Sequence, residues 1–403
     1  MNLPKFLSEV SSKTSEMTSE ELKAFISEIA RTLPEKKRES FIAVMNACQK
    51  DMVSCKSVLS DEIDLLRSSI DRSCKKLEEI NKKERVLDSE FNEEWDDWYN
   101  SDVDEVIFMD PNRLLMDIDE AINLMHKSID FEIYKEGYDL AKRLISISVT
   151  AFGDYEDLDG DPLGIVELYD YDLLSYNLER IVGEVLYITY MSHEMENRVE
   201  KLYEIMKRFQ YHSIHLEDVL QIGNHALPEF NEFLVLWINH LGMQPGRAVE
   251  RILKESQAML QDDYTLLENA RKFVVQHPTL YEEYLRLKLD SDDDRKAFEI
   301  GLEALEKIPE SLVIRSRIAL LTGQFASRLQ NESAVEYCWL LAFESDSSFV
   351  NYLRIRLLTK DWKRYEEDIR RIYEKVYSKT KRIGINNINY PGSDIENSLT
   401  KDD

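Results

Sequence analysis

Three arginines stand at matching places in consecutive segments of the chain and could bind carboxylates. Arg286 and Arg317 each lie eight residues after a proline, and Arg354 lies eight residues after Asp346 in a later segment. A guanidinium group presents its N–H donors in a planar fork, which fits a carboxylate through two parallel hydrogen bonds. If the three side chains share one face, they suit a carboxylate-bearing peptide or an acidic helix.

Two more basic residues continue this pattern. Lys288 lies ten residues after Pro278, and Arg356 lies ten residues after Asp346. Ala319 holds the corresponding place after Pro309. The alternative interpretation is that each arginine pairs with a nearby glutamate such as Glu283, or lies on the outer face. The candidate partner-binding residues are Arg286, Lys288, Arg317, Arg354 and Arg356.

The acidic run Asp154–Asp161 gathers carboxylates around Gly160 and invites comparison with a calcium loop. An EF-hand loop has an acidic ligand at its first position, glycine at its sixth and a bidentate glutamate at its twelfth. Aligned on Gly160, the first and twelfth positions hold Tyr155 and Val166. The pattern therefore favours a solvated loop, and cation binding is the alternative.

His212 and His215 are three residues apart, a spacing that places both on one face of a helix, and Glu217 and Asp218 follow. A zinc site needs a third and a fourth converging ligand. Nothing in the sequence makes further ligands converge here. We expect these histidines at a helix surface or interface.

Motifs of catalysis are absent from the sequence. The chain has no glycine-rich phosphate loop, no Gly-x-Ser-x-Gly elbow and no His-Glu-x-x-His pair. Scattered serine, histidine and aspartate residues do not make a catalytic triad without geometry. We therefore expect no enzymatic activity, no cofactor and no metal.

The candidate residues lie on an internal repeat. The hexapeptide Tyr284–Leu289 returns almost unchanged as Tyr352–Leu357, sixty-eight residues later. That offset is twice the thirty-four-residue period of tetratricopeptide-type helix pairs. Pro245, Pro278 and Pro309 follow a similar spacing, and proline cannot continue a preceding helix. The pattern predicts stacked helical hairpins, with helix in more than about 65% of residues and essentially no sheet.

Small residues at Ala297, Gly301 and Ala304 have the spacing found in the second helix of a tetratricopeptide repeat. Small side chains at helical spacing let two helices approach closely. We expect these three residues at a helix–helix contact, where a larger side chain would overpack the core.

The chain divides by pattern into several predicted regions. A small helical hairpin covers 1–48, a long helix with an acidic, aromatic-containing linker covers 49–107, a helical-repeat solenoid covers 108–382, and a disordered tail covers 383–403.

Three predictions within these regions bear on the fold. The long helix, over about 52–86, packs either within the chain or as an intermolecular coiled coil. The segment 87–112 reads as an acidic loop pinned by its aromatic residues, and Val149 reads as the end of a helix stripe.

Charge and composition exclude some partners. The formal net charge is −27, and residues 354–382 are the basic exception, so direct nucleic-acid binding is not expected. No run of about eighteen apolar residues occurs, so no membrane span is expected. The first residues lack the apolar segment of a signal peptide, and the four cysteines do not suggest a disulfide framework, which indicates a cytoplasmic protein.

Residues from about 108 to 377 resemble the helical region that follows the zinc finger in bacterial SWIM zinc-finger family proteins. Three stretches carry the resemblance: Tyr138–Leu144 with the acidic run that follows it, Pro278–Leu289, and Ala334–Leu357. The resemblance implies a tetratricopeptide-like helical fold. It implies little about function, because these stretches are patterns of helix packing.

The zinc finger of that family is missing from this chain. A SWIM finger needs Cys-x-Cys followed by Cys-x-His to surround zinc. The cysteines here are Cys48, Cys55, Cys74 and Cys338, and none has that spacing. A nucleic-acid role of the family's zinc module is therefore not carried over.

We predict an all-α, tetratricopeptide-like α-solenoid that serves as a non-enzymatic protein–protein interaction scaffold or adaptor through its concave groove. The alternative is an accessory regulator of a nucleic-acid-processing machine related to SWIM-family proteins, acting through a partner. The expected partner is a protein or an acidic peptide. The sequence leaves its identity and the oligomeric state open.

Overall fold

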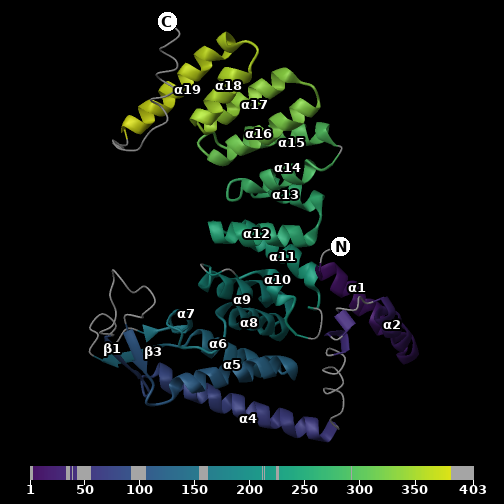
Figure 1. Cartoon of the computed structure of the whole chain (residues 1–403), viewed down its shortest axis with the longest axis vertical. Helices are drawn as coiled ribbons and strands as arrows, with labels where there is room; N and C mark the ends of the chain where they lie inside the picture. Colours follow the sequence, from purple (N-terminus) through teal and green to yellow (C-terminus); the bar gives the residue numbers. More distant parts are fainter. Residues whose placement is uncertain are drawn as a thin grey trace. The chain divides into compact units, whose positions relative to one another are not determined.

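The computed structural model describes residues 3–32, 37–38, 40–42, 56–91, 106–153, 162–210, 212, 214–223, 227–291 and 293–382. Helix makes up 73% of these residues, which confirms the mostly helical prediction (Figure 1). The predicted tail at 383–403, Cys48, Cys55 and the acidic run Asp154–Asp161 lie outside the described residues. The chain forms two compact units, Met1–Leu236 and Trp237–Asp403.

The first unit is built from helices that pack on one another in an order close to that of the sequence. Helix α4 packs on α5 and α6, α6 packs on α8, and α8 packs on α9 and α10. The helices and their bounds are α1 (Leu3–Glu16), α2 (Ser19–Thr32), α4 (Lys56–Asn81), α5 (Leu114–Asp130), α6 (Tyr134–Ile145), α7 (Ile165–Asp170), α8 (Leu178–Ser192), α9 (Met195–Arg208), α10 (Leu216–Val219) and α11 (Phe230–Gly242), which continues into the second unit.

The apolar stripe of α4 is buried within the chain. Ile70, Leu77 and Ile80 are at most 1% exposed, and α4 contacts both α5 and α6. These side chains therefore contribute to the core of the first unit. Of the two arrangements that the sequence allowed for this helix, the structure has the one in which it packs within the chain.

A small sheet in the first unit differs from the sequence prediction. Its strands are β1 (Leu87–Phe91), β2 (Val106–Met109), β3 (Val149–Gly153) and β4 (Pro162–Leu163). The strand order is β2-β1-β3-β4; the β1–β3 pair is parallel and the other two pairs are antiparallel.

The prediction of a loop at 87–112 was therefore wrong at both ends, and Val149 begins a strand rather than ending a helix. In β1, Leu87 and Ser89 are buried, whereas Asp88 and Glu90 are exposed. This alternation is the period of a half-buried strand. Acidic residues at the exposed positions made the segment look like a solvated loop.

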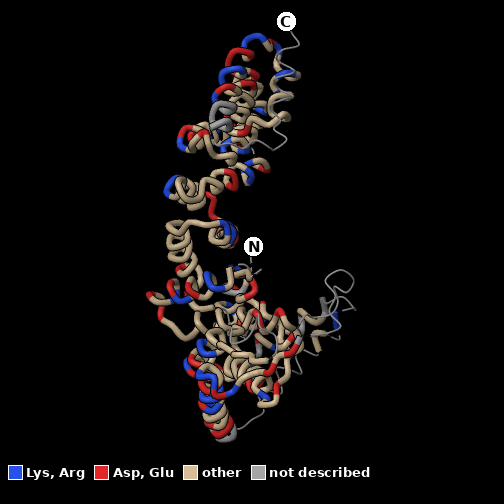
Figure 2. The backbone as a smooth tube through the Cα atoms, turned by 90° about the vertical axis from the view of Figure 1, so that its left-hand side faces the viewer, with Lys and Arg blue, Asp and Glu red and all other residues tan. Residues whose placement is uncertain are grey.

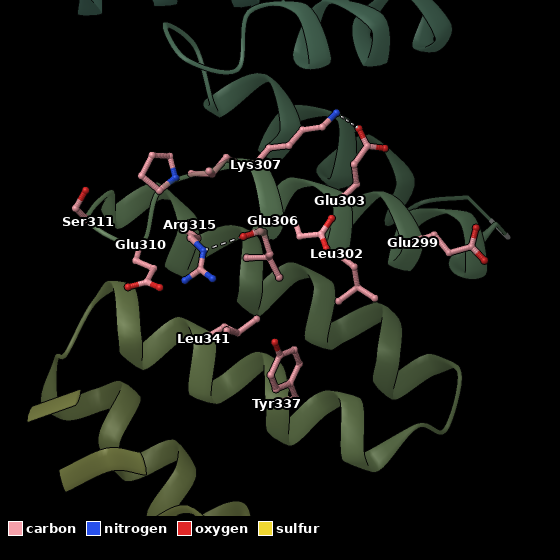
Figure 3. Close-up of a pocket in the computed structure, with 13 residues that line it drawn as sticks. Glu299, Leu302, Glu303, Glu306, Lys307, Glu310, Ser311, Arg315, Tyr337 and Leu341 are labelled. Carbon is pink, nitrogen blue, oxygen red and sulfur yellow. Dashed lines mark hydrogen bonds and ion pairs between the residues drawn. The ribbon is translucent and has the colours of Figure 1, made fainter. Parts of the chain in front are cut away.

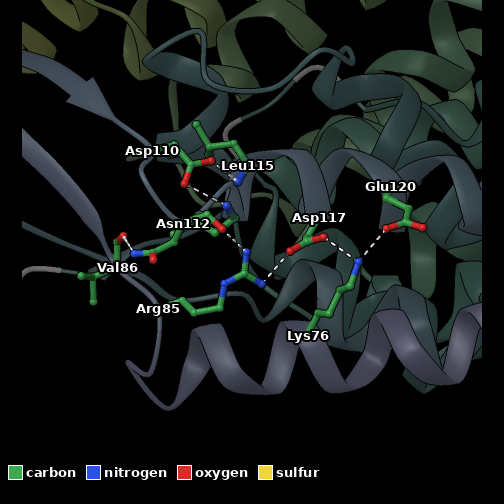
Figure 4. Close-up of polar contacts among 9 residues, drawn as sticks. Lys76, Arg85, Val86, Asp110, Asn112, Leu115, Asp117 and Glu120 are labelled. Carbon is green, nitrogen blue, oxygen red and sulfur yellow. Dashed lines mark hydrogen bonds and ion pairs between the residues drawn. The ribbon is translucent and has the colours of Figure 1, made fainter.

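A polar network fastens the sheet to the helices of the first unit (Figure 4). Lys76 on α4 contacts Asp117 at 2.7 Å and Glu120 at 2.9 Å, and Arg85 contacts Asp117 at 2.6 Å. Both carboxylate oxygens of Asp110 accept main-chain N–H groups at the start of α5. Burial opposes ionisation of Asp117, but hydrogen bonds from Lys76 and Arg85 hold the pKa of Asp117 below its usual value.

The second unit consists of helices throughout its described residues. Neighbouring helices from α13 to α19 pack in sequence, and α14 also contacts α16 directly. After the shared α11, the helices are α12 (Arg247–Leu260), α13 (Asp263–Lys272), α14 (Thr279–Lys288), α15 (Asp294–Lys307), α16 (Val313–Arg328), α17 (Glu332–Ser345), α18 (Phe349–Leu358) and α19 (Trp362–Arg382).

The repeated hexapeptides lie at the C-terminal ends of α14 and α18. Tyr284 and Tyr352, the first residues of the two copies, are 2% and 0% exposed. Pro278 is the N-cap of α14, and Pro309 lies between α15 and α16. The prolines therefore mark helix boundaries, as predicted.

Close contact between α15 and α16 depends on small residues. A Cβ atom added to Gly301 would lie 2.2 Å from Oγ1 of Thr322 and 2.8 Å from its Cγ2. Ala297 and Ala304, on the same face of α15, are 1% and 0% exposed. The prediction of a helix–helix contact is confirmed at Gly301, and Ala297 and Ala304 are buried on the same helix.

Replacing Gly301 with alanine should destabilise the protein. Alanine in a helix interior normally stabilises by about 0.5–1 kcal/mol over glycine, but the clash with Thr322 should cost about 1–3 kcal/mol, as should Ala304→Leu. Urea unfolding measures both effects. Adding Thr322→Ala to Gly301→Ala should recover part of the loss. Wild-type stability in both single variants would contradict this packing.

Candidate partner-binding surface

Two of the predicted arginines share one buried carboxylate. Arg286 on α14 donates from Nη2 and Nε to Oε1 of Glu282 at 2.7 and 3.1 Å. Arg317 on α16 places Nη2 3.0 Å from the other oxygen, Oε2, of the same residue. Glu282 is 3% exposed, whereas each arginine side chain is 56% exposed. We call Arg286 and Arg317 the arginine pair.

Local structure explains this arrangement. Glu282 and Arg286 are one helical turn apart on α14, so their side chains meet on one face. The direct packing of α16 on α14 brings Arg317, on α16, to the same carboxylate. The hydrogen bond from Arg286 to Glu282 raises the pKa of Arg286 above its usual value. Two positive charges on one negative charge leave a net charge of about +1 at this point.

The other three predicted residues have different partners. Arg354 on α18 donates to the side-chain oxygen of Asn351, whose Nδ2 lies 3.3 Å from Oγ of Ser316 on α16. Lys288 forms an ion pair with Asp263 at 2.5 Å, and Asp263 raises the pKa of Lys288. Among the predicted residues described so far, the arginine pair therefore shares one carboxylate, whereas Arg354 and Lys288 do not contact it.

Arg356 lies over an aromatic ring. Its guanidinium carbon is 4.6 Å from the centre of the Trp362 ring. Glu283, which the sequence offered as an internal partner for an arginine, instead contacts Lys254 at 3.2 Å. Internal pairing of the arginines does occur, but through Glu282.

The sequence did not predict an acidic cleft between α15 and α17 (Figure 3). Its volume is about 1030 Å³, and Tyr337 and Leu341 line the α17 side. The carboxylates that line it are those of Glu299, Glu303, Glu306 and Glu310. Their spacing of three or four residues places Glu299, Glu303 and Glu306 along one helix face, which is the signal that could have revealed the cleft.

Glu303 is the most strongly held of these carboxylates. It accepts hydrogen bonds from Arg271 at 2.7 and 2.9 Å, from Lys307 at 2.7 Å and from the hydroxyl of Tyr281 at 2.8 Å. The Arg271 bonds, helped by Lys307 and Tyr281, lower the pKa of Glu303 to about 2. Glu303 therefore links α13, α14 and α15 through hydrogen bonds within the protein, and its carboxylate oxygens already have partners.

In the described part of the chain, no group of three or more His, Cys, Asp or Glu side chains is placed to hold a metal ion. Within the same residues, no helix combines the length and the apolar composition needed to cross a bilayer. Comparison with known proteins found no matching family model, no matching curated protein and no matching solved structure. The resemblance to the SWIM helical region stays a prediction from its three sequence stretches.

Glu303→Gln should weaken the acid dependence of stability. The folded-state pKa of Glu303 is depressed from 4.5 to about 2. Its stabilising contribution is therefore present above pH 4.5 and is lost as the pH falls towards 2. The free energy of unfolding should fall less steeply over this range in the variant than in the wild type. Glu306→Gln, at an exposed position on the same helix, is the control; equal slopes in all three proteins would contradict the assignment.

Proposed function

We propose that this protein is a non-enzymatic interaction scaffold that binds an acidic segment of a partner protein through the arginine pair. The observation that carries the proposal is the shared contact with Glu282. The Glu282 carboxylate is buried and fixed in position. It binds two guanidinium groups whose side chains are more than half exposed to solvent. Side chains oriented in advance lose less freedom when a partner binds.

We infer further that the second unit is a tetratricopeptide-like array. Its helices would form the pairs α14 with α15, α16 with α17, and α18 with α19. Three facts support this arrangement: the hexapeptide recurs on α14 and α18, small residues lie at the α15–α16 contact, and the first helices α14 and α16 touch each other. First helices of such pairs line the groove in which partners bind.

The partner's chemistry follows from charge. A carboxylate entering between Arg286 and Arg317 would balance the excess charge that Glu282 leaves and could accept two parallel hydrogen bonds. Acidic and basic residues are interspersed along the helices of this unit (Figure 2). The attraction for a carboxylate would therefore come from the two arginines themselves and not from a uniformly basic surface. Such a contact should weaken with salt, because exposed charges are screened over about 8 Å at physiological ionic strength.

Arg317→Glu should reduce the affinity for an acidic partner by at least about tenfold, since charge-assisted hydrogen bonds contribute about 1.5–3 kcal/mol each. Arg286 still neutralises Glu282 in this variant, so the fold should persist, which melting would verify. The measurement is affinity capture from a native lysate, followed by titration of the recovered partner at low and high salt. Arg295→Glu, the same change at an exposed arginine on α15, should leave affinity within about twofold.

Two outcomes would count against this proposal. If Arg317→Glu retains every captured partner, the arginine pair is not the binding site. If salt leaves the affinity unchanged, a partner carboxylate is not the ligand. Capture of nucleic-acid-processing proteins would favour the second sequence-based hypothesis, the accessory regulator.

A further inference from the structure

Helix α18 in the second unit is apolar on two opposite sides. One side carries Tyr352 and Ile355, which are 0% exposed and belong to a core that α17 and α19 complete (Figure 1). On the other side, Val350, Leu357 and Leu358 are 65%, 70% and 62% exposed. A helix that is apolar all round is normally buried on every side. Helix α18 instead leaves one apolar side in contact with solvent.

The exposed residues of α18 form one continuous face. Val350, Arg354 and Leu357 follow one another at spacings of four and three residues, so their side chains lie on the same side of the helix. Leu358, one turn after Arg354, widens this side, and Leu353, half-buried against the core, forms its edge. We call these five residues the α18 face. Contiguous exposed apolar residues, unlike scattered ones, mark interaction sites.

Arg354 gives the α18 face a positive charge. Its guanidinium group donates to the side-chain oxygen of Asn351, which is a neutral acceptor. Among the described residues, no carboxylate forms an ion pair with Arg354. Residues 354–382 are net basic as well. The charge therefore favours a partner that sets a carboxylate among apolar side chains.

Helix α18 also touches the helix that carries Arg317. Nδ2 of Asn351 lies 3.3 Å from Oγ of Ser316 on α16. Ser316 directly precedes Arg317 in α16, and Asn351 directly follows Val350 in α18. A partner segment that reaches Arg317 is therefore close to α18.

We propose that the α18 face binds the apolar stripe of an amphipathic helix of a partner protein, with a carboxylate of that helix on Arg354. Apolar residues at spacings of three and four on the partner would pack against Val350 and Leu357 in a helix-on-helix contact. The inference rests on the proposed function of a scaffold for an acidic partner. It deepens that function, because it assigns the partner segment a helical form and an apolar stripe.

The test uses the full-length chain and a fluorescently labelled synthetic helical peptide that carries a stripe of leucines flanked by glutamates. Binding is followed by fluorescence anisotropy. The wild type should bind this peptide saturably, at least about tenfold more tightly than matched peptides with serine in place of leucine or lysine in place of glutamate. These two comparisons measure the apolar and the acidic requirement separately.

Variants of the chain locate the binding. The double variant Val350→Gln/Leu357→Gln, changed at two exposed positions, should bind at least about tenfold more weakly while its melting stays as in the wild type. Val275→Gln, the same change at a valine that is 82% exposed between α13 and α14, should leave the affinity within about twofold. Arg354→Gln, which keeps an amide donor for Asn351, should weaken binding of the glutamate peptide and reduce its salt dependence.

Absence of saturable binding, or equal affinity in the wild type and the double variant, would overturn the proposal. So would a wild-type dimer that the double variant dissociates in sedimentation, because the face would then bind a second copy of the chain. Binding that appears only after removal of residues 383–403 would show that the chain covers the face itself. Loss of binding to phosphatidylserine vesicles in the double variant, with no peptide binding, would reassign the face to a lipid surface.

Capture from a lysate separates this proposal from the one at the arginine pair. If Arg317→Glu loses the acidic partner while the double variant keeps it, the α18 face is excluded and the arginine pair stands. If the double variant loses the partner while Arg317→Glu keeps it, the arginine pair is excluded and the α18 face stands.

Discussion

A carboxylate that folding removes from water must be paired, and in the second unit this constraint falls on Glu282. The residue is 3% exposed, and Arg286 and Arg317 reach it from two different helices. An unpaired charge at that depth would cost roughly several kcal/mol. The contact therefore joins α14 to α16 and sets the direction in which two guanidinium groups meet solvent. A requirement of the interior thereby determines the chemistry of the surface.

The same constraint operates at other places in both units. In the first unit, Glu184 is 4% exposed and lies 3.1 Å from Nε of Arg180 and 3.0 Å from Nδ1 of His126. In the second, Arg315 is 7% exposed and contacts Glu344 on α17 at 3.1 Å. In each case a buried charge is neutralised within the unit. What distinguishes Glu282 is that both of its partners remain more than half exposed, so they can also meet a ligand.

Much of the helical architecture could be predicted from periodicity, and the α15–α16 contact could be predicted from the small residue Gly301. The pairing of Glu282 with two arginines could not be predicted, because many glutamates in the sequence lie near an arginine. The packing of α16 on α14 is what brings Arg317 to Glu282. Strand β1 was missed because Asp88 and Glu90, its exposed residues, resemble a solvated loop.

The most direct test of this account is a double-mutant cycle between Arg286→Met and Arg317→Met, with the stability of α14 and α16 measured by hydrogen exchange in the full-length chain. Each single variant leaves Glu282 one partner, whereas the double variant leaves it buried without either arginine. The loss in the double variant should therefore exceed the sum of the two single losses by about 1–3 kcal/mol. Additive losses, within about 0.5 kcal/mol, would contradict the claim that one buried carboxylate holds the arginine pair.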